Sequence, residues 1–159
     1  MASDGLATVK GHAAKFSVSV WLLLGGLVLT VIATFLPFAT ESVKLFGETL
    51  ASQQLPTTGA AKAVVIVLVA LAVFLAFPAL TGSELASSRL IGLSIVVGLL
   101  GALTVVWFLN VSSENNKGGD VVSVTPGVGL FLYGLGVVVA AVGVVRLWID
   151  RSKTLKQAY

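Results

Sequence analysis

The side chains able to perform chemistry are few in this 159-residue chain, and they are scattered. The single histidine, His12, has no serine or carboxylate placed near it as a nucleophile or partner. The absence of cysteine excludes disulfides, thiolate metal sites and cysteine nucleophiles. Glu84 and Arg89 flank one short connection, where an exposed ion pair contributes only about 0–1 kcal/mol. We therefore predict that the protein is not an enzyme and that it holds no metal and no cofactor.

Charged side chains are missing from four long apolar stretches, which implies a membrane protein. The chain is 57% hydrophobic and 11% charged, with a mean hydropathy of +1.02. A helix of about 20 residues crosses the roughly 30 Å of bilayer hydrocarbon. We predict an all-α membrane protein, a four-transmembrane-helix antiparallel bundle that forms a single domain over residues 1–159. Its expected spans are about 17–38, 61–80, 89–110 and 126–148, with tails at 1–15 and 149–159.

The basic residues predict the orientation of the bundle. Seven of them fall in the two tails and in the connection between the second and third spans: Lys10, Lys15, Arg89, Arg146, Arg151, Lys153 and Lys156. The opposite side holds only Lys44, Lys62 and Lys117. The positive-inside rule then places both termini in the cytoplasm of a bacterial plasma membrane protein. We interpret the seven residues as topology determinants that meet lipid headgroups. They are too dispersed to bind nucleic acid.

Small residues at helical spacing predict how the spans pack. Helices in lipid associate through close backbone approach, which small side chains permit. Two stripes stand out as surfaces for helix packing or partner contact. One is Gly129, Tyr133, Gly136, Ala140 and Gly143 in the fourth span, and the other is Ser94, Gly98 and Gly101 in the third. The hydroxyl of Tyr133 needs a partner, and we expect Thr30, Thr34 or Thr104 to supply it.

Two outer connections carry short β-prone runs. Residues 42–45 alternate polar and apolar side chains, and residues 121–124 are rich in valine. We consider two readings: that these runs pair as a small extracytoplasmic β-element, and that both connections are irregular loops.

Two short segments resemble those of a known group of proteins. They are Thr34-Phe35-Leu36-Pro37-Phe38, which ends the first span, and Pro126-Gly127-Val128-Gly129-Leu130, which opens the fourth. With the span layout, they resemble the small, uncharacterised four-helix integral membrane proteins of actinobacterial type. That group carries no established activity, so the resemblance implies a fold and no chemistry. The outline is also similar to claudin-like proteins, whose paired loop cysteines this chain lacks.

We consider hypotheses from two classes of function. The first is a non-enzymatic membrane protein that acts through protein or lipid contacts, as an accessory or scaffold subunit of a cell-envelope complex. Its expected partners are membrane lipids and either another membrane protein or a second copy of the chain. The alternative is a small oligomeric pore or uncoupled transporter with Thr30 and Thr34 lining its path. A phage-encoded lysis or exclusion protein is a lower-ranked variant. The apolar stretches of these spans hold no Asp, Glu, Lys, Arg or His for proton or ion coupling.

Overall fold

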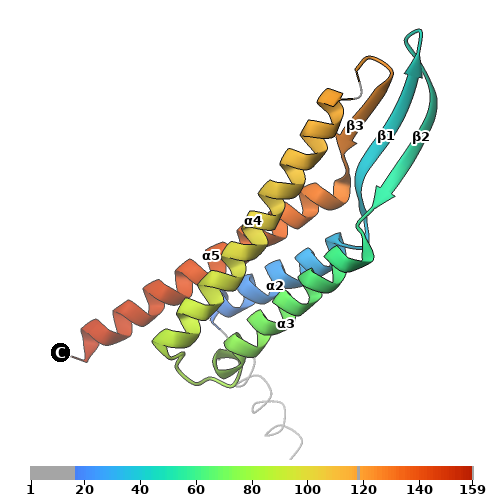
Figure 1. Cartoon of the computed structure of the whole chain (residues 1–159). Coiled ribbons are helices and arrows are strands. Elements are labelled where there is room, and N and C mark those ends of the chain that lie inside the picture. The colour runs from blue at the N-terminus through green and yellow to red at the C-terminus, as the bar shows by residue number, and fades with distance from the viewer. Residues whose placement is uncertain (1–16, 118, 159) are drawn as a thin grey trace, which may run out of the picture.

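The computed structural model describes residues 17–117 and 119–158. Over these residues the chain forms four helices and one three-stranded antiparallel sheet (Figure 1). Their order along the chain is α2 (Val18–Ala33), β1 (Pro37–Leu45), β2 (Glu48–Pro56), α3 (Gly59–Leu80), α4 (Ser87–Lys117), β3 (Val122–Pro126) and α5 (Val128–Gln157). Our predictions for residues 1–15 lie outside the described residues.

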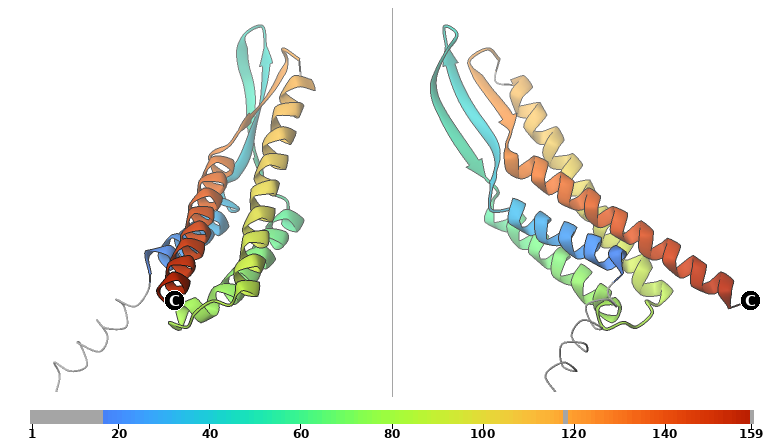
Figure 2. Two further views of the ribbon diagram at one scale, coloured as in Figure 1. Left: turned by 90° about the vertical axis from the view of Figure 1, so that its left-hand side faces the viewer. Right: turned by 180° about the vertical axis from the view of Figure 1, so that it is seen from behind.

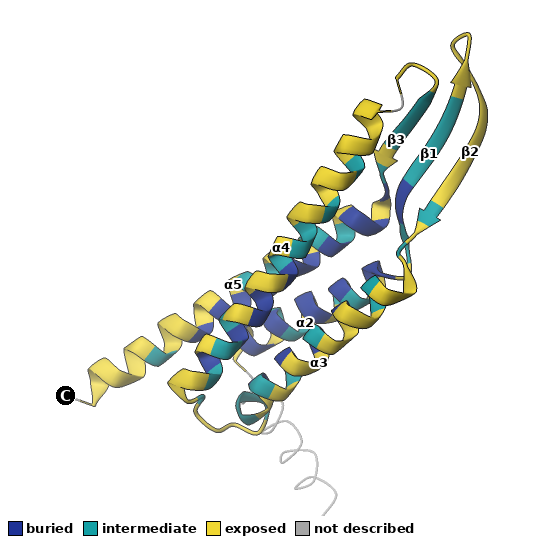
Figure 3. Cartoon of the chain, viewed as in Figure 1, coloured by how far each residue is buried: buried dark blue, intermediate teal, exposed yellow. Residues whose placement is uncertain are grey.

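The helices have the length and composition of membrane-spanning segments. Within the described residues, α3, α4 and α5 are long and apolar enough to cross a membrane. The apolar helix α2 is shorter, at 16 residues, and packs along α5 (Figure 2). Ser17 starts α2, since its hydroxyl accepts a hydrogen bond from the Val20 N–H at 3.4 Å. Large apolar side chains cover the outer surfaces of α3 and α4, and the buried residues gather where the helices face one another (Figure 3).

The sheet extends beyond the ends of α2, α3 and α5 and lies beside the last turns of α4, in the strand order β2-β1-β3. A two-residue turn joins β1 to β2, with φ of 53° at Phe46 and 86° at Gly47. Two positive φ values in a row give the twist that suits a tight hairpin. Leu45 and Glu48 pair directly across this turn.

The predicted four-transmembrane-helix antiparallel bundle is wrong. The first span was expected to run to residue 38, but α2 ends at Ala33 and the chain turns into β1 at Pro37. Most of the first outer connection forms a long hairpin, and α4 continues to Lys117 where a loop was expected from Val111. The two β-prone runs do pair, with Ser42 opposite Ser123. Strand β2 was not predicted at all.

Candidate functional site

The glycine stripe of α5 lies against the backbone of α2. A Cβ atom added at Gly136 would lie 2.6 Å from Thr30 Oγ1 and 2.8 Å from Gly26 O. One added at Gly143 would lie 2.6 Å from Leu23 N. A side chain at either position would therefore push the two helices apart. All five residues of this stripe are buried: Gly129, Tyr133, Gly136, Ala140 and Gly143. The stripe forms part of the interior of the molecule.

The small-residue stripe of α4 is much less covered. A Cβ atom at Gly98 would meet no atom within 4 Å, and one at Gly101 would lie 3.8 Å from Val137 Cγ1. Ser94 Oγ accepts a hydrogen bond from Trp148 Nε1 at 3.0 Å, which ties α4 to α5. The two predicted stripes therefore have different surroundings, one packed at backbone distance and the other largely open.

The hydroxyls of Thr30, in α2, and of Thr34, at its C-terminal cap, bond to backbone carbonyls of α2. Thr30 Oγ1 donates to Gly26 O at 2.8 Å, and Thr34 Oγ1 donates to Val31 O at 2.7 Å. Both threonines are fully buried. Their placement therefore does not support the hypothesis that the two threonines line a permeation path.

An aromatic cluster joins the helices to the sheet. The rings of Phe38, Trp107 and Tyr133 meet edge to face, with centroid distances of 5.1, 5.2 and 5.8 Å. The Tyr133 hydroxyl is buried and has no hydrogen-bond partner among the described residues. The expectation that Thr30, Thr34 or Thr104 supplies one is wrong: none of these hydroxyls lies within hydrogen-bond distance of it, and each donates its own proton to a nearby backbone carbonyl. Tyr133 acts here as a packing residue between β1 and α4.

The predicted topology residues that the structure describes lie at the end of the helices away from the sheet: Arg89, Arg146, Arg151, Lys153 and Lys156. Lys10 and Lys15 fall outside the described residues. The three lysines of the other group, Lys44, Lys62 and Lys117, lie at the sheet end. Within residues 17–117 and 119–158, no three His, Asp or Glu side chains come together to hold a metal ion.

The most distinctive surface of the molecule is the outer edge of β2, which the backbone pattern defines. Lys44 N donates to Val121 O and Gly127 N donates to Phe38 O, each at 2.7 Å. Lys44 lies directly opposite Val121, and Phe38 lies directly opposite Gly127. The backbone N–H and C=O groups of the even-numbered residues of β1 therefore bond to β3. Successive residues of an antiparallel ladder alternate in direction. The odd-numbered residues of β1, such as Glu41, therefore bond toward β2.

This alternation continues into β2 and leaves one edge unpaired. Glu41 is paired with Gln53, so the backbone groups of Gln53 point inward to β1. Those of its neighbours Ser52 and Gln54 point outward. β2 is a terminal strand of the sheet, and all of its residues except Leu55 are exposed. The outer edge of β2 therefore presents free N–H and C=O groups, which can pair with an added strand.

The opposite edge of the sheet is covered. The outward N–H of Val124 in β3 donates to Asn115 Oδ1 of α4 at 3.2 Å. By the same alternation, Pro126 also faces outward, and proline has no N–H to offer. α4 runs beside β3 (Figure 1). Neither edge was predicted from the sequence, although Gly47 between two runs of extended-type residues is a turn signal.

A search of protein-family models and of curated proteins found no match to this chain. The two segments that carry the resemblance to small four-helix membrane proteins contact each other in the fold. Besides the Gly127–Phe38 hydrogen bond, a Cβ atom at Gly129 would lie 2.8 Å from Leu36 O. These segments form the junction between the helices and the sheet, where the close approach of the two backbones requires glycine.

Proposed function

We propose that this chain is a non-enzymatic membrane protein that acts through contacts, as an accessory or scaffold subunit of a cell-envelope complex. The contact we propose is an extended strand of another protein, added to the outer edge of β2. The observation that carries the proposal is that the outward backbone groups of Ser52 and Gln54 have no partner among the described residues, on a strand that is exposed except at Leu55. Main-chain hydrogen bonds give such strand addition its affinity.

The position of the sheet supports contact outside the hydrocarbon. The 31 residues of α4 extend about 46 Å at 1.5 Å per residue. That length exceeds the roughly 30 Å of hydrocarbon in a bilayer. The last turns of α4 are polar, from Asn110 to Lys117, and Asn115 contacts β3 there. The sheet therefore lies in water or at the headgroups, where a partner strand has access.

The distribution of charge supports the orientation that we propose. The end of the helices away from the sheet holds five of the basic residues that the structure describes, and the sheet end holds three. The acidic residues Glu41, Glu48, Glu114 and Asp120 also lie at the sheet end. By the positive-inside rule, the chain is a multi-pass protein of a bacterial plasma membrane, with both termini in the cytoplasm and the sheet outside.

Strand direction favours a different protein as the partner over a second copy. Two identical strands related by a twofold axis pair antiparallel, about an axis perpendicular to the sheet. The strands point away from the helices, roughly along the end of α4 (Figures 1 and 2). A second copy paired in this way would point its helices in the opposite direction. The two copies would not fit into one membrane.

The test is crosslinking from single cysteines, because the natural chain has none. Ser52→Cys on β2 and Thr125→Cys on β3 are both exposed positions and serve as a matched pair. Each variant, in intact native cells, is modified with a membrane-impermeant photo-crosslinker. We expect attachment at both positions, and a crosslink to another chain from Ser52→Cys only. Equal crosslinking from both, or a crosslink only to a second copy, would contradict the proposal.

A further inference from the structure

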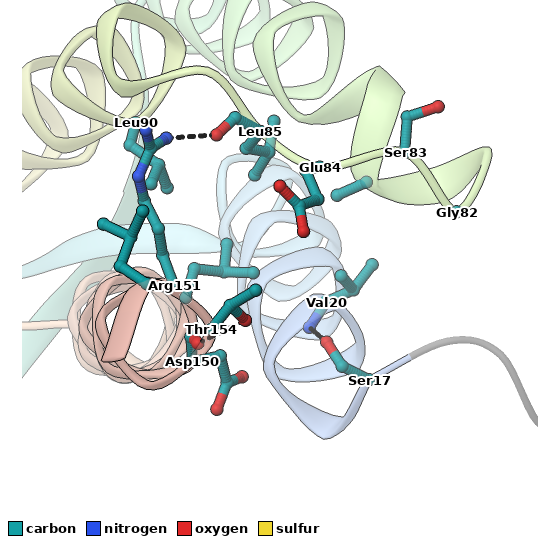
Figure 4. Close-up of a pocket in the computed structure, with 13 residues that line it drawn as sticks. Ser17, Val20, Gly82, Ser83, Glu84, Leu85, Leu90, Asp150, Arg151 and Thr154 are labelled. Atoms are coloured by element: carbon teal, nitrogen blue, oxygen red, sulfur yellow. Dashed lines mark hydrogen bonds between the residues drawn. The ribbon is translucent and has the colours of Figure 1, made fainter. Parts of the chain in front are cut away.

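A cavity of about 350 Å³ lies at the end of the molecule away from the sheet. It forms where the start of α2, the α3–α4 connection and the later turns of α5 meet (Figure 4). Val20, Leu90 and Leu147 belong to the apolar part of the lining, and Ser83, Glu84 and Arg151 belong to the polar part. Sites for small molecules begin at about 300 Å³. The cavity therefore has room for a polar headgroup and the first carbons of an attached chain.

The cavity lies at the level of the membrane interface. Leu90 and Leu147 belong to the buried core of the helices, whereas Glu84 is exposed. Trp148, next to Leu147, is 38% exposed and donates to Ser94 Oγ. Indole rings settle where hydrocarbon meets headgroups. A ligand that fills this space must be apolar at one end and polar at the other.

The polar part of the cavity holds opposite charges that do not pair with each other. Arg151 Nη1 donates to Leu85 O, which fixes the guanidinium across the cavity (Figure 4). Its other N–H groups have no described partner. Glu84 also lines the cavity, yet the one ion pair among the described residues is Lys117 with Glu114, at the sheet end. Asp150 points away from both and accepts a hydrogen bond from Ser19 Oγ at 2.7 Å.

From this arrangement we infer that the cavity binds a zwitterionic phospholipid headgroup. Its phosphate contacts Arg151, and its primary ammonium contacts Glu84. The acyl chains leave along Val20, Leu90 and Leu147. Glu84 would repel a purely anionic headgroup, and Arg151 would repel a purely cationic one. A primary ammonium donates hydrogen bonds to a carboxylate, and a quaternary one does not. The site therefore prefers phosphatidylethanolamine to phosphatidylcholine and phosphatidylglycerol.

Native mass spectrometry of the full chain in mild detergent tests this preference. The purified protein is titrated with each of the three lipids at matched acyl chains. A charge-assisted hydrogen bond contributes about 1.5–3 kcal/mol, so we expect phosphatidylethanolamine to bind about tenfold or more tightly than the others. Glu84→Gln should remove this preference, because the amide keeps the shape and loses the charge. Arg151→Gln should weaken the binding of all three lipids.

Matched controls are available on the same chain. Glu48→Gln makes the same change at the sheet end, and Lys156→Gln removes a positive charge of α5 that does not line the cavity. Both should bind like the wild type. Equal retention of the three lipids, or an unchanged preference in Glu84→Gln, would overturn the inference. Displacement of the lipid by soluble phosphoethanolamine at equal concentration would overturn the assignment to a lipid in favour of a free phosphate ester.

Discussion

The two edges of the sheet have opposite surroundings, although both belong to the same three strands. At β3 the outward N–H of Val124 is bonded to Asn115, and Pro126 has no N–H. At β2 the outward groups of Ser52 and Gln54 meet no described residue, and the strand is exposed almost throughout. Proteins commonly protect strand edges with proline, charge or a covering helix. The difference indicates that β3 is closed by the fold and that β2 is left open for a partner.

The largest expected effect comes from proline substitutions that separate the two sides of β2. Gln53→Pro removes an N–H that points to β1 and leaves a carbonyl of Glu41 unpaired. We expect a loss of about 1–3 kcal/mol in the free energy of unfolding. Gln54→Pro removes an outward N–H and should change stability by about 0.5 kcal/mol or less. Thermal unfolding in detergent measures both. Equal losses would show that the outer edge is already bonded.

A smaller effect tests the closed edge. Asn115→Ala leaves the Val124 N–H without its acceptor, at an exposed site. We expect a loss of about 0.5–1 kcal/mol and faster hydrogen exchange at the Val124 amide. Asn116→Ala, at the next residue of α4, is the control and should leave that amide unchanged. Unchanged exchange in Asn115→Ala would mean that α4 does not close this edge.

The sequence predicted the membrane character well and the sheet poorly, for physical reasons. Apolar runs such as that of α3 are explicit in the residues, because bilayer thickness sets their length. Strand β2 alternates weakly and is polar, so periodicity did not reveal it. Its turn has Phe46 where an asparagine or aspartate is usual, which hides the hairpin.

The candidate surfaces were harder to predict because spacing does not show what a face contacts. Gly136 and Gly98 occupy similar positions in two similar stripes. A Cβ atom would strike α2 at the first and nothing at the second. Likewise, Arg151 was interpreted only as a topology and headgroup residue. Its place in a cavity that Glu84 also lines depends on how α5 meets the α3–α4 connection.

The most direct measurement compares Gln54→Pro with Gln54→Ala in native membranes, by the yield of the partner that the Ser52→Cys crosslink defines. The alanine variant loses only the side chain and keeps the backbone N–H. We expect wild-type yield in Gln54→Ala and at least a tenfold loss in Gln54→Pro, with thermal stability unchanged. Val122→Pro, which removes an outward N–H from β3, should keep the wild-type yield. Partner binding that survives Gln54→Pro, or that is lost equally in Val122→Pro, would contradict strand addition at β2.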